Sequence, residues 1–352
     1  MTETMKLNKI WLLMALLVGV GSVFFIMKTT QATRGFKPVP AAQLDQRLKS
    51  QYPEFYKTIA NNKGTLTANH LIGVPGLGGA RSVGQTKQWQ YTTNMTPQSL
   101  TLNDKYIFVS AYDHTKQLNS VLFVIDRKTH QQIKTIALPT RAHVGGITID
   151  DRTQTLYLSD DSQGVTKLGR IQISKLIKSK KDQILTQFDD VITLADIKTA
   201  ATIEYYQDAI WVGTFSANKN GLIQRFPINR TTNTLLTDPD EQAPTGNLNR
   251  DTKLQTANGH IQGINFYHGN LYITFSYGKQ PAAMMRYQYD ATTNEFTYAG
   301  TMAQLPPYLE GIDFQGDNIW LIFESGAKAY RKKTPIIVDR ILQTDISNFE
   351  FK

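Results

Sequence analysis

The chain of 352 residues contains no cysteine. This absence excludes disulfide bonds, thiolate metal ligands and a cysteine nucleophile. Histidine is scarce as well, with 6 residues, and charged residues make up only 19% of the chain. Hydrophobic residues make up 41%, which is enough to fill a folded core, so extensive disorder is not expected. The length suits one large all-β domain or two ordinary domains.

The formal net charge is +9, and five bases minus one acid leave +4 of it in residues 1–37. The rest of the chain is moderately basic, which would attract anionic polymers or lipid headgroups. We find no basic stripe interleaved with aromatic residues and no nucleic-acid-binding motif. We therefore expect no nucleic-acid partner.

Only one long hydrophobic run is present, IWLLMALLVGVGSVFFIM at residues 10–27, and it carries no charge. As a helix, its 18 residues would span about 27 Å, close to the thickness of the bilayer hydrocarbon. The lysines before it predict that residues 1–9 stay in the cytoplasm and the rest lies outside. We predict a single-pass signal anchor in the cell membrane with an extracytoplasmic C-terminal domain. The alternative is a signal peptide cleaved near Ala32, which would release a secreted protein.

Residues 28–89 are expected to form a stem and linker. Apolar residues recur at helical spacing over residues 41–62, and Pro53 divides that stretch into two short helices that we expect to pack against the domain. The glycine-rich residues 71–84, LIGVPGLGGARSVG, lack the strand and the Lys-Ser/Thr end of a phosphate-binding loop, so they are interpreted as an ordinary loop.

Five segments in the remainder of the chain share one pattern. Each has a short alternating strand, a turn rich in Asp, Asn, Gly or Gln, a second strand with an apolar centre, and a small polar loop. They start at residues 96, 143, 199, 260 and 308, separated by 47, 56, 61 and 48 residues. Their sequences are TPQSLTLNDKYIFVSAYD, HVGGITIDDRTQTLYLSDD, TAATIEYYQDAIWVGTFS, HIQGINFYHGNLYITFS and YLEGIDFQGDNIWLIFES.

This period is typical of propeller blades, which are four-stranded antiparallel sheets around a central channel. We predict an all-β fold, a β-propeller of five blades over residues 90–352. Six blades are the alternative, if residues 63–95 contribute a degenerate one. The two outer strands of each blade are expected in the residues that follow each motif, and for the last blade in residues 327–342.

The segments TPQSLTLNDKYIFVSAYD, SVLFVIDRKTHQQIKTIALP and HVGGITIDD resemble secreted bacterial propeller proteins of the YncE-like superfamily. The phrase LEGIDFQGDNIWLIFE is similar to propellers of the gluconolactonase and phytase-like groups. The resemblance covers about residues 96–345 and implies the fold. It would also imply a metal held by acids and an asparagine from several blades, of which Glu310 matches the first acid. The fold hosts both enzymes and binding proteins.

Propeller geometry predicts where the polar residues converge. The first and third residues of the five motifs would form rings at one mouth of the channel, joined by the loops after the second strands. The candidate ligand-binding residues are Gln98, Tyr112, Asp113, His143, His260, Gln262, Tyr308, Glu310 and Glu324.

Two kinds of chemistry are open to this set. Two histidines and a glutamate are the ligand types of a catalytic zinc site, so His143, His260 and Glu310 are candidate ligands of a divalent metal. Glu310 and Glu324 would suit acid–base hydrolysis of a glycoside if their carboxyl groups lay about 5–10 Å apart.

The favoured function is a membrane-anchored, extracytoplasmic binding or scaffold protein with its ligand at the channel mouth. Its partner would be an anionic cell-wall polymer, a peptide or an envelope protein. The alternative is a metal-assisted, lactonase-like hydrolase.

Overall fold

The alternating patterns of the motifs form antiparallel strands in the computed structural model, which describes residues 36–66, 72–179, 181–238 and 253–352. From Pro38 to Lys352 the chain is one compact unit. The predicted anchor, residues 10–27, lies outside the described residues. Among the helices that are described, none has the length and apolar character needed to cross a membrane.

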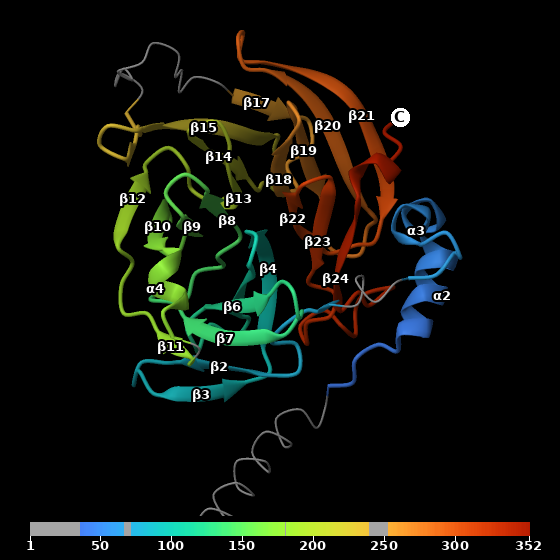
Figure 1. Cartoon of the computed structure of the whole chain (residues 1–352), viewed down its shortest axis with the longest axis horizontal. Coiled ribbons are helices and arrows are strands. Elements are labelled where there is room, and N and C mark those ends of the chain that lie inside the picture. Colours follow the sequence, from blue (N-terminus) through green and yellow to red (C-terminus); the bar gives the residue numbers. More distant parts are fainter. Residues whose placement is uncertain (1–35, 67–71, 180, 239–252) are drawn as a thin grey trace, which may run out of the picture. The chain divides into compact units, whose positions relative to one another are not determined.

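The strands form five main sheets, here called blades 1 to 5 in chain order (Figure 1). Blade 1 contains β4 (Met95–Leu102), β5 (Tyr106–Asp113), β6 (Val121–Asp126), β7 (Gln132–Ala137) and the parallel β11 (Gln183–Ile184). Blade 2 contains β8 (Ile147–Asp150), β9 (Thr155–Asp160), β10 (Thr166–Gln172) and β12 (Asp190–Leu194). Blade 3 contains β13 (Ala200–Tyr205), β14 (Ala209–Thr214) and β15 (Gly221–Asn229), with β16 (Thr234–Leu235) and β17 (Lys253–Thr256) both paired to β15.

Blade 4 contains β18 (Ile261–Tyr267), β19 (Asn270–Phe275), β20 (Ala282–Asp290) and β21 (Glu295–Leu305). Blade 5 contains β22 (Leu309–Gln315), β23 (Asn318–Phe323), β24 (Arg340–Asp345) and β1 (Ile72–Gly73). A short helix, α4 (Ile173–Ile177), follows β10, and a 3-10 turn, Ile346–Asn348, follows β24.

The first strands of the blades form a closed ring. Each of β4, β8, β13, β18 and β22 contacts the next one, and β22 contacts β4 again. Figure 1 shows the colours of the chain advancing around the centre from β4 to β24. The prediction of an all-β, five-bladed propeller is confirmed, because the ring closes with five sheets.

Closure of the ring depends on a strand from the N-terminal side. Ile72 and Gly73 pair with Ile341 and Arg340, so β1 is the outer strand of blade 5. The expected start of the propeller at residue 90 is therefore too late. Of the two outer strands expected within residues 327–342, only β24 begins in that range, at Arg340, and residues 328–333 form turns. Part of the stretch interpreted as an ordinary loop, residues 71–84, instead supplies β1 and β2 (Ala80–Val83), and β2 pairs with β3 (Trp89–Thr92).

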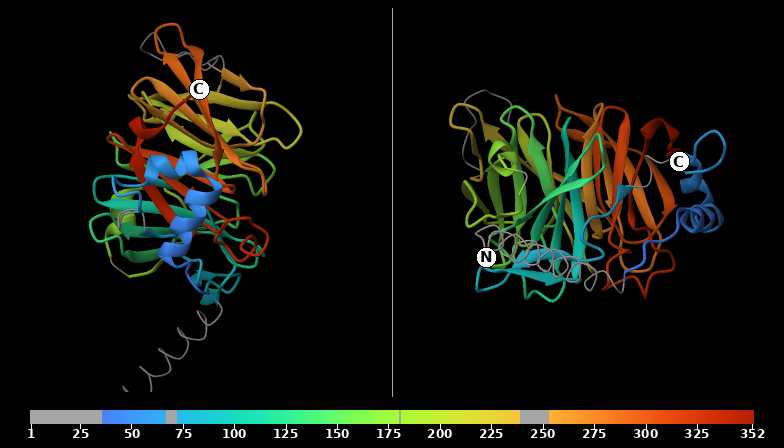
Figure 2. Two further views of the ribbon diagram at one scale, coloured as in Figure 1. Left: turned by 90° about the vertical axis from the view of Figure 1, so that its right-hand side faces the viewer. Right: turned by 60° about the horizontal axis from the view of Figure 1, so that its bottom comes forward.

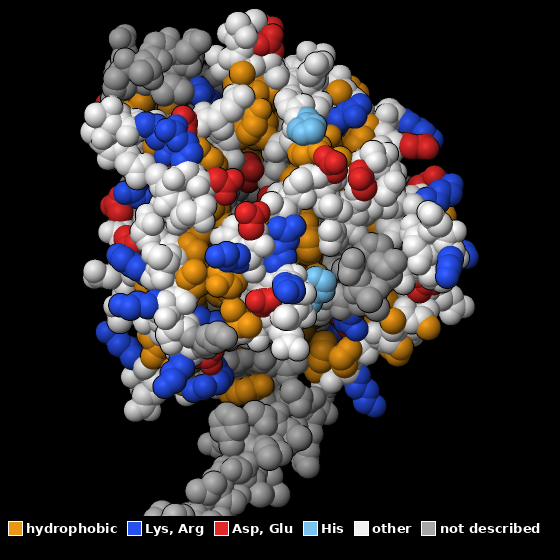
Figure 3. All heavy atoms as spheres, viewed as in Figure 1, with side chains coloured by type: hydrophobic (Ala, Val, Ile, Leu, Met, Phe, Trp, Pro, Cys, Tyr) orange, Lys and Arg blue, Asp and Glu red, His pale blue; other side chains and the backbone are white. Residues whose placement is uncertain are grey.

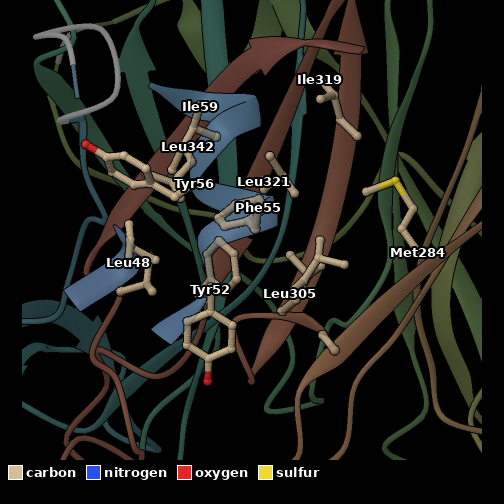
Figure 4. Packing of buried hydrophobic residues seen from close by; sticks show 14 of the residues in the cluster. Leu48, Tyr52, Phe55, Tyr56, Ile59, Met284, Leu305, Ile319, Leu321 and Leu342 are labelled. Atoms are coloured by element: carbon tan, nitrogen blue, oxygen red, sulfur yellow. The ribbon is translucent and has the colours of Figure 1, made fainter. Parts of the chain in front are cut away.

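Two helices, α2 (Ala41–Gln51) and α3 (Pro53–Ile59), lie on either side of Tyr52, where the helical spacing and Pro53 place them. They lie along the outside of blades 4 and 5 (Figure 2). Their buried side chains, including Leu48, Phe55 and Ile59, pack on Leu321 and Leu342 of blade 5 (Figure 4). The helices thus share a hydrophobic core with the propeller.

The inner strands approach one another very closely at the fourth residue of each motif. These residues are small: Ser99, Gly146, Thr202, Gly263 and Gly311. A methyl group on Gly146 would lie 2.6 Å from the backbone nitrogen of Ile203, and one on Gly311 would lie 3.0 Å from the Cα atom of Ser99. Glycine is required at positions 146 and 311 because the backbone of the neighbouring strand occupies the space that a side chain would need.

Candidate functional site

The inner strands begin at one mouth of the channel, here called the strand-start mouth, and end at the other, the strand-end mouth. At the strand-start mouth, register shifts between the first two strands of a blade fall at Gln98, Ala201, Gln262 and Glu310. A β-bulge inserts an extra residue and re-aims its side chain. The third residue of the motif is therefore the bulged residue in four blades, which explains why these positions form a ring.

Glu310 and Glu324 form the centre of this mouth. Glu310 lies in the bulge of β22, and Glu324 follows the last residue of β23, with its backbone N–H donating to the Tyr308 carbonyl at 2.9 Å. Both side chains are buried, and their carboxyl groups share a hydrogen bond. Gln98 Nε2 donates to Glu324 Oε2 at 3.2 Å and to its neighbour's carbonyl, Pro97 O, at 2.8 Å. Three of the predicted residues are thus brought into direct contact.

The pair is held partly protonated. Burial raises the pKa of Glu324 to about 8. Burial, the charge of Glu324 and the hydrogen bond between the two together raise the pKa of Glu310 well above its ordinary value. Two carboxyl groups in contact cannot both ionise easily in a site removed from water. At neutral pH, Glu310 is the protonated donor and the pair carries at most one negative charge.

The two glutamates are too close for the glycosidase geometry considered above. Carboxyl groups that share a hydrogen bond are nearer than the roughly 5–10 Å that a glycosidase needs between its acid and its nucleophile or base. That hypothesis is therefore not supported.

Aromatic rings surround the glutamate pair. Tyr112, at the end of β5, packs against His143 in a tilted arrangement with ring centroids 4.2 Å apart, and its hydroxyl contacts His114 Nδ1 at 3.0 Å. Tyr330, in the loop between β23 and β24, packs on Tyr308 at 5.0 Å and on His114 at 5.6 Å. The predicted Tyr112, His143 and Tyr308 therefore lie together.

These rings are neutral near pH 7. Burial and the charge of Glu324 raise the pKa of Tyr112 to about 12. His143 is exposed to solvent, while the atoms packed around its ring and the positive charge of Lys116 lower its pKa to about 4. The pKa of Tyr330 is raised by burial and by Glu324. Tyr330 was not among the predicted residues, because it lies in a loop outside the repeated motif.

His260 and Gln262 lie in a separate part of the mouth. The His260 ring stacks on Tyr277 at 4.5 Å and on Phe215 at 5.8 Å, and its Nε2 lies 3.2 Å from the Ala217 carbonyl oxygen. Gln262 Nε2 donates to the Ser276 carbonyl at 3.3 Å. These two of the nine predicted residues form their own cluster between blades 3 and 4.

The predicted metal centre is not assembled. His143 packs beside Tyr112, His260 beside Tyr277, and Glu310 against Glu324. Across the described ranges, no three His, Asp or Glu side chains are grouped so that they could hold a metal ion. The motif places the two histidines on different blades. The His143 ring packs against Tyr112, and the His260 ring packs against Tyr277.

Asp113 has a different role from the one predicted. Its carboxylate accepts hydrogen bonds from the backbone N–H groups of Thr115, Gln117 and Leu118 at 3.2, 3.1 and 2.9 Å. The Thr115 hydroxyl lies 2.9 Å from both carboxylate oxygens. Asp113 therefore fixes the loop after β5 and has little capacity left for a ligand.

No protein-family model and no curated protein matches the chain. Among solved structures, it is similar to the hydrazine synthase of Kuenenia stuttgartiensis (12% identity, TM-score 0.37, 65% of this chain and 56% of that chain). It is also similar to the Dos1 propeller (11%, 0.37, 68% and 56%) and to a Bacteroides uniformis protein described as a 6-phosphogluconolactonase (12%, 0.33, 66% and 62%). The chain spans less than two thirds of each of these proteins. At these scores the similarities carry no argument about function.

Proposed function

We propose that this chain is a membrane-anchored, extracytoplasmic propeller that binds a neutral, hydroxyl-rich ligand, such as a glycan chain of the cell wall, at the strand-start mouth. The observation that supports this proposal is the buried Glu310–Glu324 pair beneath the rings of Tyr112, Tyr330 and His143.

The chemistry of the mouth favours hydroxyl groups as partners. The proton of Glu310 is held in the hydrogen bond to Glu324, so the pair offers acceptor oxygens to a ligand. The neutral imidazole of His143 can also accept, and the tyrosine hydroxyls can both donate and accept. Because burial keeps most of these groups uncharged, a strongly charged ligand would gain little from them. Aromatic faces beside a few polar groups suit the mixed apolar and polar surface of a sugar ring.

Binding to neutral glycan fragments is the direct test. Isothermal titration of the full chain in detergent micelles is expected to show binding of neutral N-acetylglucosamine oligosaccharides and weaker binding of anionic teichoic acid. Glu324→Gln together with His143→Ala is expected to weaken glycan binding at least tenfold. Glu204 of β13 lines a cavity at the strand-end mouth. Glu204→Gln is therefore the matched control and should leave glycan binding unchanged.

Two results would contradict the proposal. One is glycan affinity that the double variant leaves intact. The other is tighter binding of the anionic polymer than of the neutral glycan, which would favour the expectation drawn from the net charge.

The anchor is part of the same proposal and is tested separately. The uncharged residues 10–27 predict that the full chain stays in the membrane after carbonate extraction and that protease added outside the cell digests the propeller. A soluble product whose N-terminus lies near Ala32 would instead show signal cleavage.

A further inference from the structure

A cavity opens at the strand-end mouth. It has a volume of about 360 Å³ and is lined by the last residues of the inner strands. The sixth residue of every motif lines it: Thr101, Thr148, Glu204, Asn265 and Asp313. In Figure 3, several Asp and Glu side chains surround a hollow near the middle of the face shown. The repeat therefore builds a second ring, and all five of its members are polar.

This cavity is distinct from the strand-start mouth. The ring of small residues at the fourth motif position lies between the strand-start mouth and this cavity. At Gly146 and Gly311 in that ring, the backbone of the neighbouring inner strand lies within contact distance. Glu310 and Glu324 do not line the cavity.

Two of the side chains that line the cavity, Asn265 and Glu204, offer acceptor atoms to it. Asp313 accepts from the N–H groups of Leu102 and Phe314 at 2.8 and 2.7 Å, and from Asn265 Nδ2 at 2.8 Å. Because the Asn265 amide nitrogen donates to the Asp313 carboxylate, the Asn265 amide oxygen points away from Asp313. Asn265 is 2% exposed, and none of the described residues donates a hydrogen bond to that oxygen.

Glu204 is the other side chain with acceptor capacity to spare. Thr148 Oγ1 donates to Glu204 Oε2 at 3.1 Å, and no Lys or Arg among the lining residues pairs with this carboxylate. The Thr148 hydroxyl in turn accepts from the Tyr205 N–H at 2.9 Å, which fixes its direction. A ligand that supplies N–H donors would satisfy both Glu204 and Asn265.

The charge of the lining has one sign. Asp151, Glu204 and Asp313 are its carboxylates, and the sixteen lining residues include no Lys or Arg. Arg230, which packs behind the Tyr205 ring, is already paired with Asp150 at 2.6 Å and Asp208 at 2.7 Å.

The pKa values of the three lining carboxyl groups are raised. Burial raises the pKa of Asp313 to about 6, and burial followed by the charge of Asp313 raises the pKa of Glu204 well above its ordinary value. For Asp151, burial and the charges of Asp150 and Asp104 raise the pKa. A bound cation would reverse these effects and so release protons.

We propose that the strand-end cavity binds a small organic cation through a primary ammonium group, which donates to Asn265 Oδ1 and to the Glu204 carboxylate. Three carboxylates that do not converge on one point are poorly placed for direct coordination of a metal ion, but they suit an ammonium group, whose three N–H donors diverge. The cavity has the size of sites that hold small metabolites.

The test compares two molecules of equal length, 1,4-diaminobutane and 1,4-butanediol, by titration calorimetry with the full chain in detergent. The diamine is expected to bind at least tenfold more tightly than the diol. Its affinity should rise about tenfold from pH 5 to pH 7, with protons released to the buffer, because Glu204 and Asp313 must ionise. The proton release is read on the wild-type chain and does not depend on how a variant folds.

Single substitutions test whether the diamine binds in the strand-end cavity. Glu204→Gln and Asn265→Leu are each expected to weaken diamine binding about tenfold, whereas Glu324→Gln at the strand-start mouth should leave it unchanged. Equal affinity for diamine and diol, or binding without proton release, would overturn the proposal. So would stoichiometric binding of Ca²⁺ or Mg²⁺ that displaces the diamine.

Discussion

Glu310 lies on β22 of blade 5 and Glu324 directly follows the neighbouring strand β23, and their buried carboxyl groups share a hydrogen bond at the mouth where the inner strands begin. One residue sits in a β-bulge of β22 and the other follows β23, so the contact depends on the register of two strands. The bulge turns Glu310 toward its partner, and Gly311 beside it allows β22 to approach Ser99 of β4. The free energy of unfolding should therefore depend on this contact between Glu310 and Glu324.

The free energy of unfolding is expected to fall as the pH rises from about 4.5 to 8. The folded-state pKa of Glu324 is raised to about 8 and that of Glu310 is raised well above its ordinary value, so between these limits the folded state holds more protons than the unfolded state. Their stabilising effect is complete below the unfolded pKa and is lost as the pH passes through the folded values. Urea unfolding at pH 5, 6.5 and 8 measures the slope, which should become flatter in Glu324→Gln. Stability that rises across this range would contradict the assignment.

Glu310→Gln is expected to be far milder than Glu310→Ala. The amide of glutamine can still donate to Glu324, so the change should alter stability at pH 7 by no more than about 1 kcal/mol. Alanine removes the donor and leaves a buried void, at a cost of about 2–4 kcal/mol. Denaturant unfolding of the two variants under the same conditions compares them. Equal costs would mean that the hydrogen bond contributes nothing.

Gly146→Ala is expected to destabilise the propeller by about 1–3 kcal/mol, because the new methyl group would lie 2.6 Å from the backbone nitrogen of Ile203. Gly73→Ala is the matched control, since nothing lies within 4 Å of its added methyl group. Thermal unfolding distinguishes the two variants. A control as unstable as Gly146→Ala would show that loss of glycine itself, and not the approach of β13, is responsible.

Phe55→Ala is expected to destabilise the whole propeller by about 3–5 kcal/mol in a single transition. Phe55 of α3 is 0% exposed and lies in one core with Leu321 and Leu342 of blade 5. Lys57→Ala on the same helix removes only an exposed ion pair with Glu54 and should change stability very little. A separate early transition for the helices would contradict a shared core.

Chelation is expected to leave the melting temperature of the full chain unchanged within about 1 °C. The reason is the separation of His143 and His260 into two aromatic clusters, which leaves the predicted ligand set unassembled. His260→Ala should likewise leave the bound-metal content unchanged in elemental analysis. A stoichiometric metal that is lost in this variant would restore the original hypothesis.

The sequence alone was sufficient to identify the repeat and with it the number of blades. The pattern recurs locally in each blade, because a half-buried strand must alternate and a turn needs particular residues. The same pattern predicted that the first and third motif residues gather at one mouth. That gathering is realised for Gln98, Glu310 and Glu324, which are in contact.

The tertiary structure decided what the motif leaves open. Blade 5 is completed by the pairing of β1 with β24, which are more than 260 residues apart in the sequence. Residues 72–73 are too few to show a pattern that predicts this pairing. Whether His143 and His260 meet depends on how each ring packs against its neighbours, and this varies between blades. The ring at Thr101, Thr148, Glu204, Asn265 and Asp313 was visible as the sixth motif position. Only the closed ring of strands shows that these five side chains line one cavity, because strand alternation does not say which face meets the channel.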